Sequence, residues 1–235
     1  MTTLHLLSGG AAKGLVTAVQ DRFHAETGAS IEGRFNAVGM MKDQLLAGAP
    51  CDVVILTSAL ITQLTESCDV ASGSSRPLGL VKTGIAVKDG VTPPPLTTVA
   101  QFRQALLAAG AIYFPDPVKA TAGIHFMKVM RLLGVDTELA SRFRPHPNGA
   151  AAMHALAQSD EPNAIGCTQA TEIIFAEGVQ LAAALPAEFE LATVYTAAVS
   201  SKATQPRAAA ALIELLTNEE AAGLRSAGGF EPIPE

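Results

Sequence analysis

The chain has 235 residues, of which 49% are hydrophobic and only 16% charged, and its formal net charge at pH 7 is −6. This composition excludes a disordered chain, because the apolar side chains suffice to form a core, and the length fits one large domain or two small lobes. The negative charge and the lack of a Lys/Arg cluster exclude nucleic acid as the main partner. Charged residues, Gly or Pro interrupt every apolar run before about 18 residues, so we expect no membrane insertion.

Apolar runs alternate with helical patterns along the chain, an order typical of an α/β fold with a parallel sheet covered by helices. The first expected strands are 4–8, 31–35 and 52–56, and the helices that follow them are 11–27, 38–47 and 58–66. After a Ser/Gly-rich loop at 67–77, strands are expected at 78–87, 111–114, 164–167, 179–183 and 191–200. The remaining expected helices are 97–109, 121–134, 148–158, 168–177, 205–216 and 218–226.

Four expected strand ends lead directly into helices through small or polar residues. In an open parallel sheet, ligands bind beyond the carboxyl ends of the strands. Helix N-termini at that edge present N–H groups and a partial positive charge, which favours an anion. Such turns usually serve only to cap helices, but four in one chain indicate an anion site. The residues concerned are Ser8, Gly9 and Gly10, then Asn36 and Ala37, then Thr121 and Gly123, and finally Thr168 and Gln169.

Common cofactor and metal motifs are missing from the sequence. It contains no phosphate loop, dinucleotide fingerprint or zinc-protease motif. Three cysteines without short spacing, and five histidines without ligand spacing, predict neither a metal site nor any other cofactor. His125, in the first turn of its expected helix, is a candidate ligand-facing group, with solvent exposure as the alternative. Lys13 and Lys119 could face a carboxylate, although exposed lysines are the commoner outcome.

Several segments, in this order and spacing, resemble the molybdate-binding branch of the type II periplasmic-binding-protein superfamily. The similarity covers nearly the whole chain. Its carriers are Ser8-Gly-Gly-Ala-Ala-Lys-Gly14, Phe23-His-Ala-Glu-Thr-Gly28, Gly48-Ala-Pro-Cys-Asp-Val-Val-Ile55, Ile112-Tyr-Phe-Pro-Asp-Pro117, Thr121-Ala-Gly123, Ile165-Gly166 and Val194-Tyr-Thr-Ala-Ala198.

The resemblance implies two Rossmann-like α/β lobes, joined by two crossover strands and closing over a small ligand. The first lobe would hold residues 1–79 and 199–235, and the second residues 80–198. Ligand contacts would come from the strand ends named above, with Asn148, Gln169 and Tyr195 as additions. Because the second turn, Asn36-Ala-Val-Gly39, lacks a hydroxyl residue, a small di- or tricarboxylate is as good a candidate as molybdate.

Two functions of different classes follow. The first is a substrate-binding protein that captures a small anion and delivers it to an ABC importer if the chain is exported. The second is a cofactor-independent isomerase, because this branch also resembles aconitate isomerase. In the second case His125 or Lys13 would be the base.

The N-terminus leaves two locations open. No basic region and apolar segment typical of a signal peptide precede Ser8, so the sequence as written indicates a cytoplasmic protein. The alternative is a periplasmic protein in which Met1 replaces a removed signal.

Overall fold

The computed structural model describes residues 2–234, and the chain folds into two compact units. Unit 1 comprises the residues up to Val81 and from Thr193 onward, and unit 2 comprises Lys82–Ala192. The chain passes between the units within β4 (Arg76–Lys88) and at the start of β9 (Ala192–Val199). The expected boundaries after residues 79 and 198 lie two residues before and six residues after these points. Tyr195 therefore belongs to unit 1 and not, as expected, to the second lobe. The question of Met1 falls outside the described residues.

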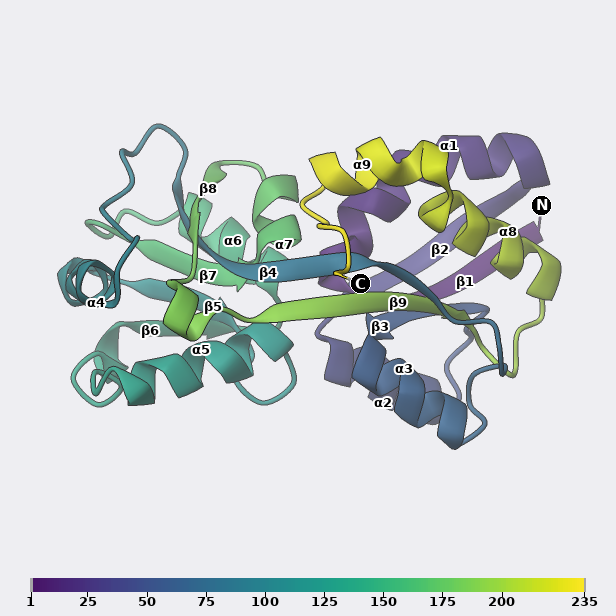
Figure 1. Ribbon diagram of the computed structural model, residues 1–235, viewed down its shortest axis with the longest axis horizontal. Coiled ribbons are helices and arrows are strands. Elements are labelled where there is room, and N and C mark those ends of the chain that lie inside the picture. Colours follow the sequence, from purple (N-terminus) through teal and green to yellow (C-terminus); the bar gives the residue numbers. More distant parts are fainter. Residues whose placement is uncertain (1, 235) are drawn as a thin grey trace. The chain divides into compact units, whose positions relative to one another are not determined.

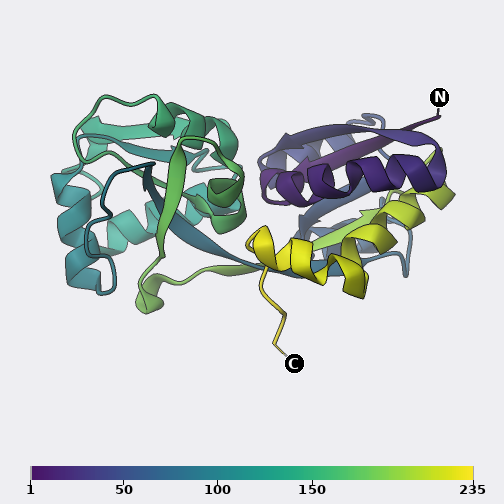
Figure 2. The same ribbon diagram turned by 90° about the horizontal axis from the view of Figure 1, so that it is seen from above.

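Unit 1 is a sheet of strand order β2-β1-β3-β9, in which β9 is antiparallel to β3 and the other pairs are parallel. Helices α1, α8 and α9 pack together although they come from opposite ends of the sequence, and α2 and α3 cover the other face (Figures 1 and 2). The strands are β1 (Thr2–Gly9), β2 (Ala29–Asn36) and β3 (Val53–Thr57), with β9 as given above. The helices are η1 (Gly10–Ala12), α1 (Lys13–Thr27), α2 (Val38–Leu46), α3 (Ser58–Glu66), α8 (Pro206–Thr217), η4 (Glu219–Ala221) and α9 (Ala222–Ala227).

Apolar residues at the expected helical spacing form part of the core of unit 1. Leu15, Val19 and Phe23 recur every four residues on α1 and are buried against the sheet. Gly28 ends the helix in the left-handed conformation, at φ +68°, which a residue with a Cβ adopts at a cost. All five residues of β3 are buried, as the continuous apolar run predicted.

Unit 2 is a mixed sheet of order β4-β7-β5-β6, with β8 also paired to β4. One apolar core lies under α4 and α5, and a second, smaller core lies under α6 and α7. The strands are β5 (Ile112–Pro115), β6 (Phe143–His146), β7 (Ile165–Gln169) and β8 (Val179–Ala184). The helices are α4 (Val99–Ala108), α5 (Thr121–Leu132), η2 (Ala140–Arg142), α6 (Gly149–Ala157), α7 (Ala170–Phe175) and η3 (Ala187–Phe189).

Unit 2 corrects two expectations. Strand β6 was not expected, because its sequence, Phe-Arg-Pro-His, contains a proline and a charge; it lies at the edge of the sheet, where a strand tolerates proline. The helix expected over 168–177 begins only at Ala170, because Thr168 and Gln169 continue β7 as partners of Gly84 and Thr83. Gln169 is therefore the last residue of a strand.

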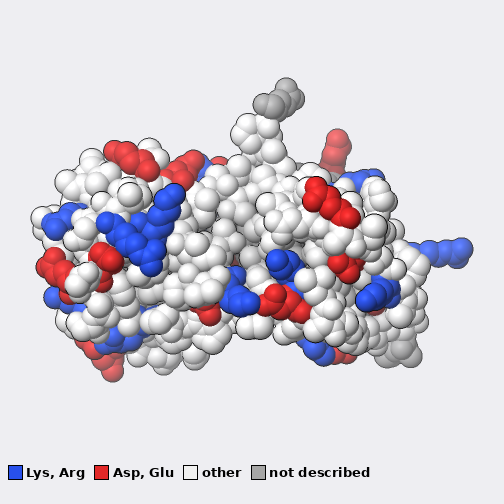
Figure 3. All heavy atoms as spheres, turned by 90° about the horizontal axis from the view of Figure 1, so that it is seen from below, with Lys and Arg blue, Asp and Glu red and all other residues white. Residues whose placement is uncertain are grey.

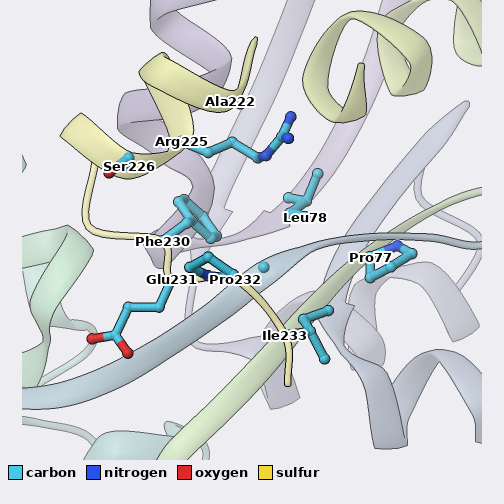
Figure 4. A pocket seen from close by; sticks show the side chains of 10 residues that line it. Pro77, Leu78, Ala222, Arg225, Ser226, Phe230, Glu231, Pro232 and Ile233 are labelled. Carbon is cyan, nitrogen blue, oxygen red and sulfur yellow. The ribbon is translucent and has the colours of Figure 1, made fainter. Parts of the chain in front are cut away.

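The C-terminal segment of unit 1 lies along the start of β4. Leu80 and Glu231 exchange two backbone hydrogen bonds, of 2.8 and 2.7 Å. Gly79, at φ +146°, permits this approach, because a Cβ there would lie 2.9 Å from the Glu231 carbonyl oxygen. A cavity of about 270 Å³ lies between this segment, α9 and β4 (Figure 4). Arg225, which lines the cavity, donates to the carbonyl oxygens of Leu216 and Asn218. None of the expected site residues lines this cavity.

Candidate functional site

Unit 1 gathers its expected site residues at one edge of its sheet. In the strand register Gly9 pairs with Asn36, and Ser8 pairs with Ile55 two residues before β3 ends. Tyr195 on β9 pairs with Thr57, the last residue of β3. The ends of β1, β2 and β3 and the Tyr195 position therefore share this edge, as expected for a ligand site.

Gly9 allows close packing at the turn from β1 into η1. A Cβ at this position would lie 2.7 Å from Val38 Cγ1 and 3.1 Å from Tyr195 Cε1. The side chains of α2 and β9 thus flank the backbone of the turn. No larger residue fits at position 9 without moving Val38, and this explains the glycine without reference to a ligand.

Ser8 and Asn36 both make local hydrogen bonds. The buried Ser8 hydroxyl donates to the Gly9 carbonyl oxygen at 2.9 Å. Asn36 Oδ1 accepts the Ala37 N–H at 2.8 Å, just ahead of α2, for which Ala37 is the N-cap residue. A ligand at this edge would meet the Ser8 hydroxyl only after the hydroxyl rotates, and Ala37 N–H only after Asn36 releases it. Their ligand roles stay predictions.

Thr57 and Ser58 are further candidates that the sequence interpretation missed. Thr57 ends β3 as N-cap of α3, and its Oγ1 accepts the Leu60 N–H, while Ser58 is exposed. The available signal was a pair of adjacent hydroxyl residues between a buried strand and a helix. The sequence interpretation ended that strand at residue 56 and did not examine this turn.

Unit 2 brings its expected residues to the corresponding edge of its own sheet. Strand β5 pairs in parallel with β6, Pro115 opposite His146, and also with β7. The three carboxyl ends therefore lie side by side. Thr121 opens α5 after β5, Asn148 caps α6 after β6, and Gln169 ends β7.

The turn between β5 and α5 explains why residue 123 is glycine. A Cβ on Gly123 would lie 2.2 Å from the Pro115 carbonyl oxygen and 2.4 Å from that of Asp116. Asp116 Oδ1 accepts the N–H groups of Val118 and Lys119, at 2.7 and 2.9 Å, and holds the loop. The first turn of α5 can therefore lie directly against the loop backbone.

The start of α6 lies against a carboxyl group. Asn148 Oδ1 accepts the Ala151 N–H at 2.8 Å, an ordinary helix cap. A Cβ on Gly149 would lie 2.0 Å from Glu172 Oε2, which accepts a hydrogen bond from the Thr168 hydroxyl. Burial raises the pKa of Glu172, and hydrogen bonds from Thr168 and the Gln169 N–H only partly offset that rise. This half-buried carboxyl group therefore lies directly against the first turn of α6.

His125 and Lys13, the two residues expected to act in catalysis, lie in different surroundings. His125 Nε2 lies 2.7 Å from the Phe189 carbonyl oxygen, so this nitrogen carries the hydrogen in that bond and only Nδ1 could act as a base. Lys13 is the exposed first residue of α1. They belong to different units, His125 to unit 2 and Lys13 to unit 1.

The helices that begin at the candidate edges differ in whether a side chain caps them. Helices α3, α4 and α6 have side-chain caps, from Thr57, Thr98 and Asn148. In contrast, no side chain caps η1, α1, α2 or α5 in the part of the chain that the structure describes. Helices α7, α8 and α9 also lack a side-chain cap. An uncapped helix N-terminus can bind water or an anion through its first N–H groups.

Charged side chains of both signs lie on the surface of the described residues. On the face shown in Figure 3, basic and acidic side chains are scattered and form no continuous patch. No group of three or more His, Cys, Asp and Glu side chains among these residues could hold a metal ion. None of the described helices combines the length and apolar character needed to cross a membrane.

A family model described as bacterial extracellular solute-binding protein matches residues 4–231. The chain belongs to this family. Among solved structures, this solute-binding protein is similar to the periplasmic molybdate-binding protein of Azotobacter vinelandii, with a TM-score of 0.81, 18% identity, and coverage of 99% of this chain and 100% of that one. The sulfate-binding protein SubI of Mycobacterium tuberculosis gives a TM-score of 0.75 at 17% identity, covering 99% and 88%. The expected fold, two α/β units of the periplasmic-binding type, is confirmed.

A curated relative points to the second function. Aconitate isomerase from a Pseudomonas species is 26% identical over 245 residues, which cover all of this chain and 89% of the relative. The solute-binding protein thus resembles both binding proteins and one enzyme along its whole length.

Proposed function

We propose that this solute-binding protein captures a small anion, either an oxyanion such as molybdate or a small di- or tricarboxylate, and delivers it outside the cytoplasm to an ABC importer. One observation carries the proposal. The helices that begin at Gly10, Val38 and Thr121 lack side-chain caps, and the strand register places their N-termini at the carboxyl edges of the two sheets. Such N-termini bind anions through neutral N–H donors.

Thermal unfolding against a panel of anions tests this proposal. The panel comprises molybdate, tungstate, sulfate, phosphate, citrate, both aconitates and smaller dicarboxylates. We expect at least one to raise the unfolding temperature by several degrees, because a ligand at about 100 times its Kd stabilises by about 2.7 kcal/mol. If none of them shifts the transition at millimolar concentration, the chain is not a receptor for small anions.

The Ser8→Ala variant tests whether unit 1 contributes to the site. We expect the affinity for the best anion to fall by about 1–2 kcal/mol, because the Ser8 hydroxyl is then lost as a donor. Ser30→Ala, at an exposed position on the neighbouring strand β2, is the matched control and should leave affinity unchanged. Isothermal titration measures both. Equal affinities in the two variants would remove Ser8 from the site.

The similarity to aconitate isomerase favours a second candidate, a cofactor-independent isomerase of a small unsaturated polycarboxylate. In this reaction a base removes one proton from an allylic carbon, the double bond shifts by one position, and a proton is returned to the far carbon, with no net oxidation. His125, through Nδ1, or Lys13 would be the base, and the helix N-termini would hold the carboxylates.

Proton exchange in heavy water distinguishes the two functions. If the chain is an isomerase, NMR will show deuterium entering cis- or trans-aconitate, and His125→Ala will abolish that exchange while aconitate still raises the unfolding temperature. If aconitate binds to the unmodified protein but the cis and trans isomers neither interconvert nor take up deuterium, the isomerase is ruled out. Exchange that survives in His125→Ala would exclude His125 and leave Lys13 to be tested by Lys13→Met.

A further inference from the structure

Buried polar atoms without hydrogen-bond partners gather at one place in unit 2. Among residues 2–234 such side-chain atoms occur on four residues. Of these, Gln169 ends β7, Thr83 lies opposite it on β4, and Thr171 follows on α7. Gln169 is 3% exposed, and both its Oε1 and its Nε2 lack partners. The hydroxyls of Thr83, 1% exposed, and Thr171, 4% exposed, are also without partners.

Thr83 and Gln169 lie side by side on one face of the sheet. They are register partners on the antiparallel strands β4 and β7, so their side chains point to the same face. Two residues along each strand, Ile85 and Cys167 form the next pair and lie in the core under α4 and α5. The two polar side chains therefore continue the α5 face to the edge where α5 begins at Thr121.

The hydrogen-bond donors and acceptors of Thr83 and Gln169 restrict which ligand group can bind to them. The Gln169 amide offers two N–H donors and one carbonyl acceptor, and the Thr83 hydroxyl both donates and accepts. A fully ionised oxyanion only accepts, so it would leave the Gln169 carbonyl oxygen unsatisfied. A hydroxyl group donates and accepts at once and so can satisfy the amide oxygen together with an N–H or O–H donor.

We infer that Gln169 and Thr83 recognise a hydroxyl group of the ligand, so that the anion is a small hydroxy-di- or hydroxytricarboxylate. The inference rests on the proposed function, in which uncapped helix N-termini such as that of α5 hold the carboxylates. Because the amide is shielded from water and unpaired, an analogue that lacks the hydroxyl leaves it unpaired in the complex as well. Sites built in this way reject the analogue strongly.

Calorimetric titration with matched probes tests this inference. Citrate is compared with tricarballylate and malate with succinate, pairs that differ only in the hydroxyl; trans-aconitate, sulfate and molybdate complete the set. We expect the unmodified protein to bind the hydroxy acid of at least one pair tenfold or more tightly than its partner. Affinities of both pairs within twofold, or a preference for trans-aconitate, sulfate or molybdate, would overturn the inference.

Variants connect the preference to these side chains. Gln169→Leu should reduce the ratio of the affinities for the hydroxy acid and for its partner without the hydroxyl to below threefold. The same variant should raise the unfolding temperature of the ligand-free protein, because an unpaired buried amide is removed. Gln44→Leu is the matched control: Gln44 Oε1 on α2 in unit 1 is also buried without a partner, and its removal should leave the ratio unchanged. An unchanged ratio in Gln169→Leu would overturn the role of the amide.

The remaining outcomes are separable. Thr83→Val, which keeps the side-chain shape, supplies the same test if Gln169→Leu does not fold, and it should also lower the ratio. If no anion in the set binds, the proposed function fails. If carboxylates bind without any preference for the hydroxyl, only this inference fails.

Discussion

Replacing Asp52 with asparagine should lower the free energy of unfolding by about 3 kcal/mol, because hydrogen bonds to a buried carboxylate are among the stronger ones in proteins. Asp52 is 1% exposed. Its Oδ2 accepts the His5 N–H at 2.8 Å, and its Oδ1 accepts the N–H groups of Thr204 and Gln205 at 2.7 and 2.9 Å and the Thr204 hydroxyl. One carboxylate thus joins β1, the start of β3 and the beginning of α8. An asparagine amide would direct N–H groups at one of these donors.

Urea unfolding of Asp52→Asn beside Asp21→Asn measures this effect. Asp21 is exposed on α1, so the second variant should unfold like the unmodified protein. Equal stability of the two variants would show that the carboxylate charge contributes nothing at position 52.

The stabilising effect of Asp52 should also depend on pH. Burial raises the pKa of this carboxyl group, but the hydrogen bonds outweigh burial and the net pKa lies below the ordinary 3.8. Because the folded pKa is the lower one, the carboxylate stabilises the fold fully above about pH 5, and this contribution is lost as the pH falls through 3.8 and below. The stability difference between the unmodified protein and Asp52→Asn should therefore shrink between pH 5 and pH 3. A difference that stays constant would contradict the lowered pKa.

Replacing Gly123 with alanine should destabilise unit 2 by about 3 kcal/mol, at the upper end for overpacking. The new Cβ would lie within 2.4 Å of two backbone carbonyl oxygens, which cannot rotate away as a side chain can. Relief requires α5 to move from the loop after β5, so anion affinity should fall as well. Circular dichroism during urea unfolding and titration with the best anion measure the two effects.

Gly223→Ala is the matched control for Gly123→Ala. Gly223 lies within α9, and a Cβ at this position would meet no atom within 4 Å, so alanine should be neutral or stabilise by up to about 1 kcal/mol. If both variants unfold at the same urea concentration as the unmodified protein, the close packing at Gly123 does not constrain the fold.

The local pattern of apolar residues was sufficient to predict most helices and strands. The spacing of Leu15, Val19 and Phe23 identified α1, and the apolar run after Asp52 identified β3, because a buried face requires apolar residues at the period of its element. The residues at which helices and strands begin and end depended on strand pairing. Thr168 and Gln169 were expected to open the helix over 168–177, but hydrogen bonding to β4 extends β7 through them. Edge strand β6 carried too little apolar signal to be expected.

For the candidate site, too, the sequence determined some features and the tertiary structure others. The sequence by itself determined the α/β order, the small and polar residues at the turns that precede the helices at Gly10 and Thr121, and the family resemblance, because these depend on residue types and spacing along the chain. Only the tertiary structure decided that Gly9 and Gly123 are packing glycines, that His125 Nε2 is bonded to the Phe189 carbonyl, and that Thr83 and Gln169 form an unpaired polar couple. Most of these properties arise between residues distant in sequence, up to 186 positions apart for Gly9 and Tyr195, and the packing at Gly123 depends on how the loop after β5 folds back on α5. The sequence around a residue does not show which backbone or side-chain groups the folded chain brings into contact with that residue.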